Sequence, residues 1–254
     1  MRLFIIAWLT LWHLSTSAHT LWVYDQENKQ VVLEENGDQV RPIASITKIM
    51  TAMVYLDYTQ DLDQKIYFKP VLGSRLPARE YTRSDLLKAL LVKSDNSAAE
   101  MLAADYPGGR EEFIRAMNVK AILLGMHNTS FVDPSGLGKN NLSTGQEVNL
   151  MTNLAFTYYE FIKETSAKKQ VTVETKTKKK KSLITLDNTN SNLLNRFSNI
   201  VMSKTGFTGP AGRCVTFVIK ENQRLYTIVI LGAKSVPDRI DLAKKIIYNL
   251  QTGV

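Results

Sequence analysis

The sequence predicts an α+β domain in which an antiparallel sheet is flanked by helices. Short β-prone runs occur near the start of the chain, at residues 21–33, and again from residue 171 onward. The stretch between them, about residues 45–168, has mostly helical periodicity. Strands at both ends with helices between them are typical of one sheet whose terminal strands come together.

The first strands are expected to form a hairpin. Residues 21–24 and 31–33 are rich in β-branched and aromatic residues, and the polar residues between them suit a turn. The Glu-Asn-Gly-Asp sequence of residues 35–38 predicts a second turn, which leads the chain towards the first helix.

The first helix is predicted from the spacing of its apolar residues. Pro42 disfavours a helical conformation in the residue before it, so the helix is expected to begin near Ser45. Apolar positions recur at i, i+3, i+4, i+7 and i+8, which indicates a single buried stripe of Ile46, Ile49, Met50, Met53 and Val54.

Ser45 and Lys48 lie three residues apart and therefore share one face of this helix. One interpretation is structural, with Ser45 as an N-cap and Lys48 as a solvated charge. A capping pair usually has Glu or Gln at the third position, because an acidic group suits the positive end of the helix. A partly desolvated lysine there has a lowered pKa, and a neutral amine beside a serine hydroxyl is a general base beside a nucleophile. This pattern alone leaves both interpretations open.

The rest of the helical block is divided by loops. Helices are predicted at residues 84–93, 97–105 and 111–124, and a further one begins at the capping-box sequence of residues 143–146. Ser94-Asp95-Asn96 separates the first two of these helices. Residues 128–141 are rich in Asn, Gly and Ser and are expected to form a loop.

The last third of the chain predicts strands and one helix. Residues 171–173 and 182–185 flank a lysine-rich segment, Lys176 and Lys178 to Lys181, which we interpret as the solvated tip of a hairpin or loop; contact with an anionic cell-wall surface is the alternative. Stronger strands are expected at residues 200–205, 213–219 and 225–231. Residues 237–250 form an amphipathic pattern that predicts a closing helix packed on the sheet.

Composition excludes several classes of protein. The 254 residues suffice for one large domain, and the formal net charge is +8. A basic surface favours polyanions, but no nucleic-acid-binding motif is present, so no nucleic-acid partner is expected. A single cysteine, Cys214, cannot form an internal disulfide, and three histidines with one thiol argue against a clustered metal site. We expect neither metal nor cofactor.

The first 18 residues have the pattern of an export signal. Arg2 is followed by an apolar core from Leu3 to Leu14 and by the small residues of a cleavage zone at 15–18. The apolar core is shorter than a membrane span requires. The mature protein is expected to start near His19, to lack a membrane anchor and to work in the periplasm or outside the cytoplasm; a retained leader that anchors the chain is the alternative.

Two further motifs strengthen the catalytic interpretation. Ser94-Asp95-Asn96 lies at a break between helices, and Lys204-Thr205-Gly206 ends a strand. The set S-x-x-K, S-D-N and K-T-G, in this order, is found in penicillin-binding proteins and class A β-lactamases. The chain resembles the low-molecular-mass penicillin-binding proteins, serine DD-peptidases that trim peptidoglycan, from about residue 21 to residue 250. Further similar stretches lie at residues 41–45, 106–110, 131–137, 203–208 and 211–214.

This resemblance implies a β-lactamase/DD-peptidase-like fold with an inserted all-helical subdomain, spanning residues 19–254 after the leader. It also implies four catalytic roles. Ser45 is the nucleophile that forms an acyl-enzyme, and Lys48 takes its proton. Ser94 relays a proton towards the leaving amine, and Asn96 holds the substrate backbone or Lys48.

The same resemblance implies the substrate-binding residues. Lys204 and Thr205 receive the substrate carboxylate, and the strand at Gly206 and Phe207 pairs with the peptide. The backbone N–H groups of Ser45 and Phe207 would form the oxyanion hole. Gly206 is expected to let a substrate backbone come close.

The histidine count agrees with lysine as the base. A Ser-His-Asp hydrolase needs a well-placed histidine, and after removal of the leader only His19, at the terminus, and His127, beside a loop, remain. Cys214 lies within a strand pattern and is interpreted as a small buried residue rather than a nucleophile.

Peptidoglycan stem peptides are therefore the expected substrates and β-lactams the expected inhibitors. The similarity favours the endopeptidase-type branch, which cuts D-alanyl cross-links, over D-Ala-D-Ala carboxypeptidases. A class A-like β-lactamase would need a deacylating glutamate, for which Glu147 is the nearest candidate, although it lies within a predicted helix. A non-catalytic penicillin-binding wall sensor is the remaining alternative.

Overall fold

The computed structural model describes residues 19–70, 74, 76–176 and 181–252. The predicted leader and residues 177–180 of the lysine-rich segment lie outside these ranges. The elements, in chain order, are β1 (Thr20–Asp25), β2 (Gln30–Glu35), β3 (Arg41–Pro42), a 3₁₀ helix (Ala44–Thr47), α1 (Lys48–Tyr58), β4 (Lys65–Phe68), β5 (Arg79–Thr82), α2 (Arg83–Lys88), a π-helix (Ala89–Lys93), α3 (Asn96–Ala104), α4 (Gly109–Leu123), β6 (Leu142–Ser143), α5 (Gly145–Tyr158), α6 (Glu160–Ser166), β7 (Gln170–Lys176), β8 (Lys181–Asp187), α7 (Ser191–Arg196), β9 (Ile200–Thr208), β10 (Gly212–Glu221), β11 (Arg224–Ala233) and α8 (Val236–Thr252).

The main sheet joins the two ends of the chain, as predicted. Its strand order is β2-β1-β11-β10-β9, and each neighbouring pair is antiparallel. Thr20 at the start of β1 lies opposite Leu231 of β11, so the N-terminal hairpin extends a sheet built from the C-terminal strands. The tight turn between β10 and β11 is made by Asn222 and Gln223, both with positive φ, which suits a two-residue hairpin. β9 is left at the edge of this sheet.

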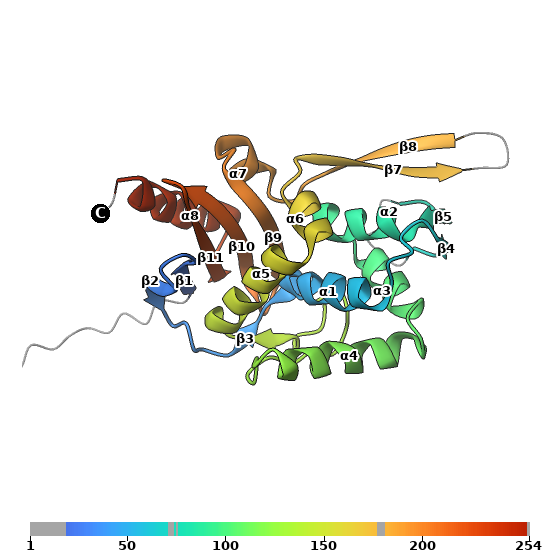
Figure 1. Cartoon of the computed structure of the whole chain (residues 1–254), viewed down its shortest axis with the longest axis horizontal. Helices are drawn as coiled ribbons and strands as arrows, with labels where there is room; N and C mark the ends of the chain where they lie inside the picture. The colour runs from blue at the N-terminus through green and yellow to red at the C-terminus, as the bar shows by residue number, and fades with distance from the viewer. Residues whose placement is uncertain (1–18, 71–73, 75, 177–180, 253–254) are drawn as a thin grey trace, which may run out of the picture.

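The sheet has a hydrophobic core on each face, because its strands alternate apolar side chains between the two sides. On one face, side chains such as Phe217 and Ile228 pack against Ala243 and Ile247 of α8. This confirms that the closing helix packs on the sheet. On the other face, side chains such as Val218 and Val229 join the larger core of the helical block. Figure 1 shows α8 on one side of the sheet and α5, α6 and α1 on the other.

Helix α1 runs through the middle of the helical block. We expected one buried stripe, but every residue from Lys48 to Leu56 is buried. The reason is that α3, α4 and α5 all pack around this helix, so it has no solvent face. The helix also starts later than predicted, since Ala44–Thr47 form a 3₁₀ turn and α1 begins at Lys48.

The helical block is not purely helical, which differs from the expectation of an all-helical insertion. It contains the short β4–β5 hairpin and the two-residue β3–β6 pair. Strands of two to four residues carry too little alternation to be recognised in sequence. The six-residue helix α7 was missed for the same reason of length.

Strands β7 and β8 form a separate two-stranded sheet, as the hairpin prediction required. Figure 1 shows this hairpin extending beside α2 and β5, away from the main sheet. Its inward side chains, such as Val173, are buried. No helix in the described ranges is both long and apolar enough to cross a membrane.

Candidate active site

The three predicted motifs meet at one cavity of about 300 Å³. The 3₁₀ turn before α1, the connection between the π-helix and α3, and the edge strand β9 each contribute part of its wall. The lining residues are Ser45, Ser94, Asn96, Leu137, Thr189, Asn192, Thr205, Gly206, Phe207, Arg213, Val236 and Arg239. Six of the eight predicted site residues line it, and the other two, Lys48 and Lys204, are buried beside it.

Ser45 is presented by a strained turn. Ala44 has a φ of 48°, a left-handed conformation that costs a non-glycine residue roughly 1–2 kcal/mol. Two glycines make room for it: a Cβ on Gly136 would overlap the Ala44 carbonyl, and a Cβ on Gly206 would lie 3.0 Å from the Ser45 nitrogen. Because Gly206 has no side chain, β9 can approach the Ser45 turn closely. We expected Gly206 to make room for a substrate backbone, but within the protein it makes room for this turn.

Lys48 is fully buried and makes three hydrogen bonds. Its Nζ lies 2.8 Å from Ser45 Oγ and 2.7 Å from Asn96 Oδ1, and it also donates to the Ser135 carbonyl. The structural interpretation of Ser45 as an N-cap does not hold, because no side-chain cap hydrogen bond is made at this helix start. Nor is Lys48 a solvated charge.

Burial lowers the pKa of Lys48 to about 7, and the carboxylates of Asp133, Asp95 and Glu100 partly oppose that shift. A lysine with such a pKa is partly neutral at neutral pH. A neutral amine within hydrogen-bond distance of a serine hydroxyl has the geometry of a general base beside a nucleophile.

Ser94 also has a left-handed conformation, with a φ of 59°, directly after the π-helix. Its Oγ accepts a hydrogen bond of 2.8 Å from Lys204 Nζ, which also donates to the Thr205 carbonyl. Burial, followed by the nearby charges of Lys48 and Arg239, lowers the pKa of Lys204 well below its ordinary value. A bound anionic group would oppose this shift, because a negative charge nearby favours the ammonium form of Lys204.

The edge strand β9 supplies the opposite wall. Thr205 donates to Thr189 Oγ1 over 2.6 Å, which ties β9 to the turn after β8. Phe207 is about half exposed, and the guanidinium of Arg213 stacks on its ring at 3.4 Å. Because β9 is the last strand of the sheet, its outer edge is free of strand pairing in the described structure.

Several lining residues were not predicted. Arg239 is 5% exposed, and its Nε has no hydrogen-bond partner among the described residues, although Nη1 bonds the Cys214 carbonyl. Thr189 lies in the turn after β8 and Asn192 lies in α7, and Ser135 accepts from Lys48 beside the cavity through its main-chain carbonyl. The Asn- and Ser-rich sequence of residues 188–192 can be recognised, but it does not show that these residues face the cavity, because that depends on tertiary packing.

Two residues considered in the sequence serve elsewhere. Glu147 is held by hydrogen bonds from Asn128 and Thr129, and the described lining of the cavity contains no carboxylate. A deacylating glutamate is therefore not supported at this position. Cys214 is fully buried, and burial raises the pKa of its thiol to about 11, so it is an unreactive core residue, as expected.

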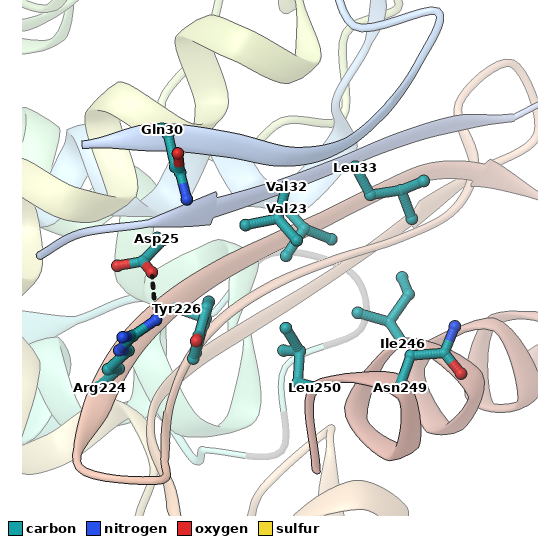
Figure 2. A pocket seen from close by; sticks show the side chains of 10 residues that line it. All are labelled: Val23, Asp25, Gln30, Val32, Leu33, Arg224, Tyr226, Ile246, Asn249 and Leu250. Atoms are coloured by element: carbon teal, nitrogen blue, oxygen red, sulfur yellow. Dashed lines mark ion pairs between the residues drawn. The ribbon is translucent and has the colours of Figure 1, made fainter. Parts of the chain in front are cut away.

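A second cavity of about 360 Å³ lies between β1, β2, β11 and the end of α8 (Figure 2). Half of its ten lining residues are aliphatic, and Asp25 and Arg224 form an ion pair of 3.6 Å at one end. None of its lining residues is a serine, cysteine, histidine or lysine. It therefore lacks the serine and lysine pair found at Ser45. Across the described ranges, no group of three or more His, Cys, Asp or Glu side chains could hold a metal ion.

Comparisons with known proteins agree with this geometry. The family described as D-alanyl-D-alanine carboxypeptidase matches residues 10–235. The D-alanyl-D-alanine endopeptidases of Pseudomonas aeruginosa and Escherichia coli are each 36% identical to the chain, over 83% of its length and 70% of theirs.

Solved structures show the same fold. A Streptomyces DD-transpeptidase superposes with a TM-score of 0.85 at 27% identity, over 92% of this chain and 96% of that one. Penicillin-binding protein D2 from Listeria monocytogenes, in its ampicillin-bound form, superposes with a TM-score of 0.81 at 30% identity, over 91% and 96%. The predicted fold class is confirmed, and the chain belongs to the D-alanyl-D-alanine carboxypeptidase family of peptidases.

Proposed function

We propose that the protein is a serine DD-peptidase that hydrolyses D-alanyl bonds in peptidoglycan through an acyl-enzyme on Ser45, with cross-links as its main substrate. The observation that carries this proposal is the buried amine of Lys48, which lies 2.8 Å from Ser45 Oγ and has a pKa of about 7. The reaction needs no metal or cofactor, because nucleophile, base and charge stabilisation all come from side chains and backbone.

Acylation begins when neutral Lys48 takes the proton of Ser45 as Oγ attacks the carbonyl carbon of the D-alanyl residue. The carbonyl oxygen becomes an oxyanion, which the N–H groups of Ser45 and Phe207 stabilise. Ser94, which accepts from Lys204, can then donate its own hydroxyl proton to the departing amine and regain one from the Lys48 ammonium, which returns to the neutral amine. The C–N bond breaks, and the acyl group stays on Ser45. Water attacks this ester and releases the product.

Positive charge around the cavity suits the carboxylate of a D-amino acid on the leaving side. Lys204 and the nearly buried Arg239 approach the cavity without a carboxylate partner in its described lining. The peptide can add to the free edge of β9 as an extra strand, near Gly206 and Phe207. Substitution Arg239→Gln should raise KM more than it lowers kcat, because it removes a binding charge remote from the proton transfers.

The endopeptidase assignment rests on the two 36%-identical relatives that carry that name. D-Ala-D-Ala carboxypeptidase is the second candidate, since relatives such as the Bacillus subtilis protein, 28% identical, are named so. Both activities use the same acyl-enzyme and differ in the leaving group. Export, periplasmic action and inhibition by β-lactams belong to this proposal, the last supported by the ampicillin-bound Listeria structure.

The test is mass spectrometry of purified protein incubated with cross-linked muropeptide dimers and, separately, with pentapeptide monomers. Conversion of dimers to monomers would support the endopeptidase, whereas loss of only the terminal D-alanine would support the carboxypeptidase. Ser45→Ala should abolish both reactions and the covalent mass increase with penicillin. Covalent labelling of Ser45→Ala would show that another residue is the nucleophile. Fast turnover of a chromogenic cephalosporin would favour a β-lactamase, and labelling without any product would favour a sensor.

A further inference from the structure

The loop of residues 133–138, here the Asp133 loop, contacts the catalytic lysine through the Ser135 carbonyl. We propose that Asp133 is a positioning residue: it holds this loop so that the Ser135 carbonyl faces Lys48 and thereby directs the amine lone pair towards Ser45. The inference rests on the proposed function and adds a component outside the three motifs.

Asp133 is the centre of the loop. Its Oδ1 accepts hydrogen bonds from the backbone nitrogens of Ser135, Gly136 and Leu137 and from the Ser135 hydroxyl. Its Oδ2 accepts from Gly138 N and from the Asn141 side chain. The carboxyl is nearly buried, at 7% exposure. A neutral group could not satisfy so many donors, because an ionised carboxylate offers about four acceptor sites and only acceptors.

The carboxyl remains ionised despite its burial. Burial alone would raise the pKa of Asp133, but the hydrogen bonds from Ser135, Gly138 and Asn141 outweigh burial and lower it. A negative charge therefore persists close to Lys48 at every pH at which the enzyme would work.

The valences of Lys48 Nζ explain why the Ser135 carbonyl matters. A neutral amine has two N–H donors and one lone pair, whereas an ammonium has three donors and none. Asn96 Oδ1 and the Ser135 carbonyl can only accept, so they engage the two N–H bonds of the neutral amine. The lone pair then faces the third neighbour, Ser45 Oγ. If the Ser135 carbonyl moved away, one N–H would be free to rotate towards Ser45 and the lone pair would lose its direction.

Two further contacts tie the loop to the nucleophile. Thr51, one turn after Lys48 on α1, donates to the Pro134 carbonyl over 2.6 Å. Gly136, next to Ser135, packs under the Ala44 carbonyl so closely that a Cβ would overlap it. The Asp133 loop therefore touches both the residue before the nucleophile and the helix that carries the base.

The charges that act on Lys48 come from several elements. Asp133 lies on the loop, Asp95 precedes α3, and Glu100 is within α3; all three favour the ammonium form. Lys204 of β9 is the opposing cation. Loss of the Asp133 charge therefore lowers the pKa of Lys48 and favours its neutral amine. Loss of the Ser135 carbonyl acts in the same direction, because an ammonium needs three acceptors.

The experiment measures the second-order rate of Ser45 acylation by a fluorescent penicillin from about pH 5 to pH 9. Asp133→Asn should lower the plateau rate by about 10- to 100-fold, because the lone pair is misdirected, and should move the acid limb to lower pH. Asp133→Glu keeps the charge but not the geometry, so its plateau should fall while its acid limb stays near that of the wild type.

Asn118→Ala is the matched control. Asn118 anchors the neighbouring backbone through two hydrogen bonds with Phe131, and its hydrogen bonds involve neither Lys48 nor the Asp133 loop. It should lower the melting temperature without moving the acid limb. A merely structural Asp133 would behave in the same way as this control.

Thr51→Val tests the inference if Asp133→Asn does not fold. This near-isosteric change releases the Pro134 carbonyl without altering charge, and it should lower the plateau rate several-fold. Wild-type plateaus for the folded Asp133 variants, or for Thr51→Val, would overturn the inference. Absence of Ser45 acylation in the wild type would instead overturn the proposed function, so the two failures are distinguishable.

Discussion

The Nζ of Lys48 and the Oγ of Ser45 lie 2.8 Å apart, although the two residues belong to different elements. Ser45 is in a 3₁₀ turn and Lys48 is the first residue of α1. The turn contains the left-handed Ala44, and Ser45 lines the cavity while Lys48 is fully buried. In the proposed mechanism, the pair is thus a partly exposed nucleophile beside a desolvated base.

The pH dependence of acylation should follow this base. Below a pH of about 7 Lys48 is protonated and cannot accept the Ser45 proton, so the acylation rate should fall about tenfold per pH unit as the solution becomes more acidic. Stopped-flow or quenched labelling with penicillin measures this limb. Lys48→Arg, which cannot deprotonate, should react about 10²- to 10⁴-fold more slowly at the plateau. A rate independent of pH between 5 and 9 would exclude Lys48 as the base.

Asn96→Asp should move the acid limb to higher pH. The substitution is isosteric but places a carboxylate 2.7 Å from Lys48 Nζ, which stabilises the ammonium and raises its pKa. At pH 7 the variant should acylate more slowly than the wild type, and the difference should shrink as the pH rises.

Asn192→Asp is the control for that experiment, because it adds the same charge to the cavity lining at a residue that is not among the hydrogen-bond partners of Lys48. The acid limb of the Asn192→Asp variant should shift less than that of the Asn96→Asp variant. Equal shifts in the two variants would mean that the effect is a general field and not a contact between residue 96 and the base.

Gly206→Ala should impair both folding stability and acylation. The new Cβ would lie 3.0 Å from the Ser45 nitrogen and from the Ile43 carbonyl, so β9 or the Ser45 turn must move. Overpacking of this kind costs about 1–3 kcal/mol of unfolding free energy, and displacement of the nucleophile can cost about 10²-fold in rate. Gly209→Ala, whose Cβ would meet nothing within 4 Å, should change neither quantity in denaturation and labelling assays.

Arg83 should matter for stability rather than chemistry. It begins α2, and its guanidinium bonds Asp105 at the end of α3, where Tyr55 of α1 also donates. Arg83→Met leaves a largely buried carboxylate without its cation, and urea denaturation should show a loss of about 3 kcal/mol. Lys163→Met, which breaks an exposed pair with Glu160, should have an effect within experimental error. A loss no larger for Arg83→Met than for Lys163→Met would contradict this role.

Much of the fold could be predicted because its signals are local. The alternation of β10 and β11, the turn at Asn222 and Gln223, and the apolar stripe of α8 depend on neighbouring residues, and each was found. The β4–β5 hairpin was missed because four-residue strands carry too little pattern. The buried circumference of α1 was missed because its periodicity resembles that of a helix at a surface.

The candidate site, too, could be predicted from the sequence only in part. By itself the sequence determined the three motifs, and these predict the nucleophile and the base, because the motifs occur together in this order in penicillin-binding proteins and class A β-lactamases. Only tertiary structure decided which residues complete the cavity, namely Arg239 from α8, Thr189 from the turn after β8 and Asn192 from α7, and that the Ser135 carbonyl contacts Lys48. The physical reason is that the pKa of Lys48 and the direction of its lone pair depend on burial and on hydrogen bonds to residues 48 and 87 positions away in the chain, which no local pattern encodes.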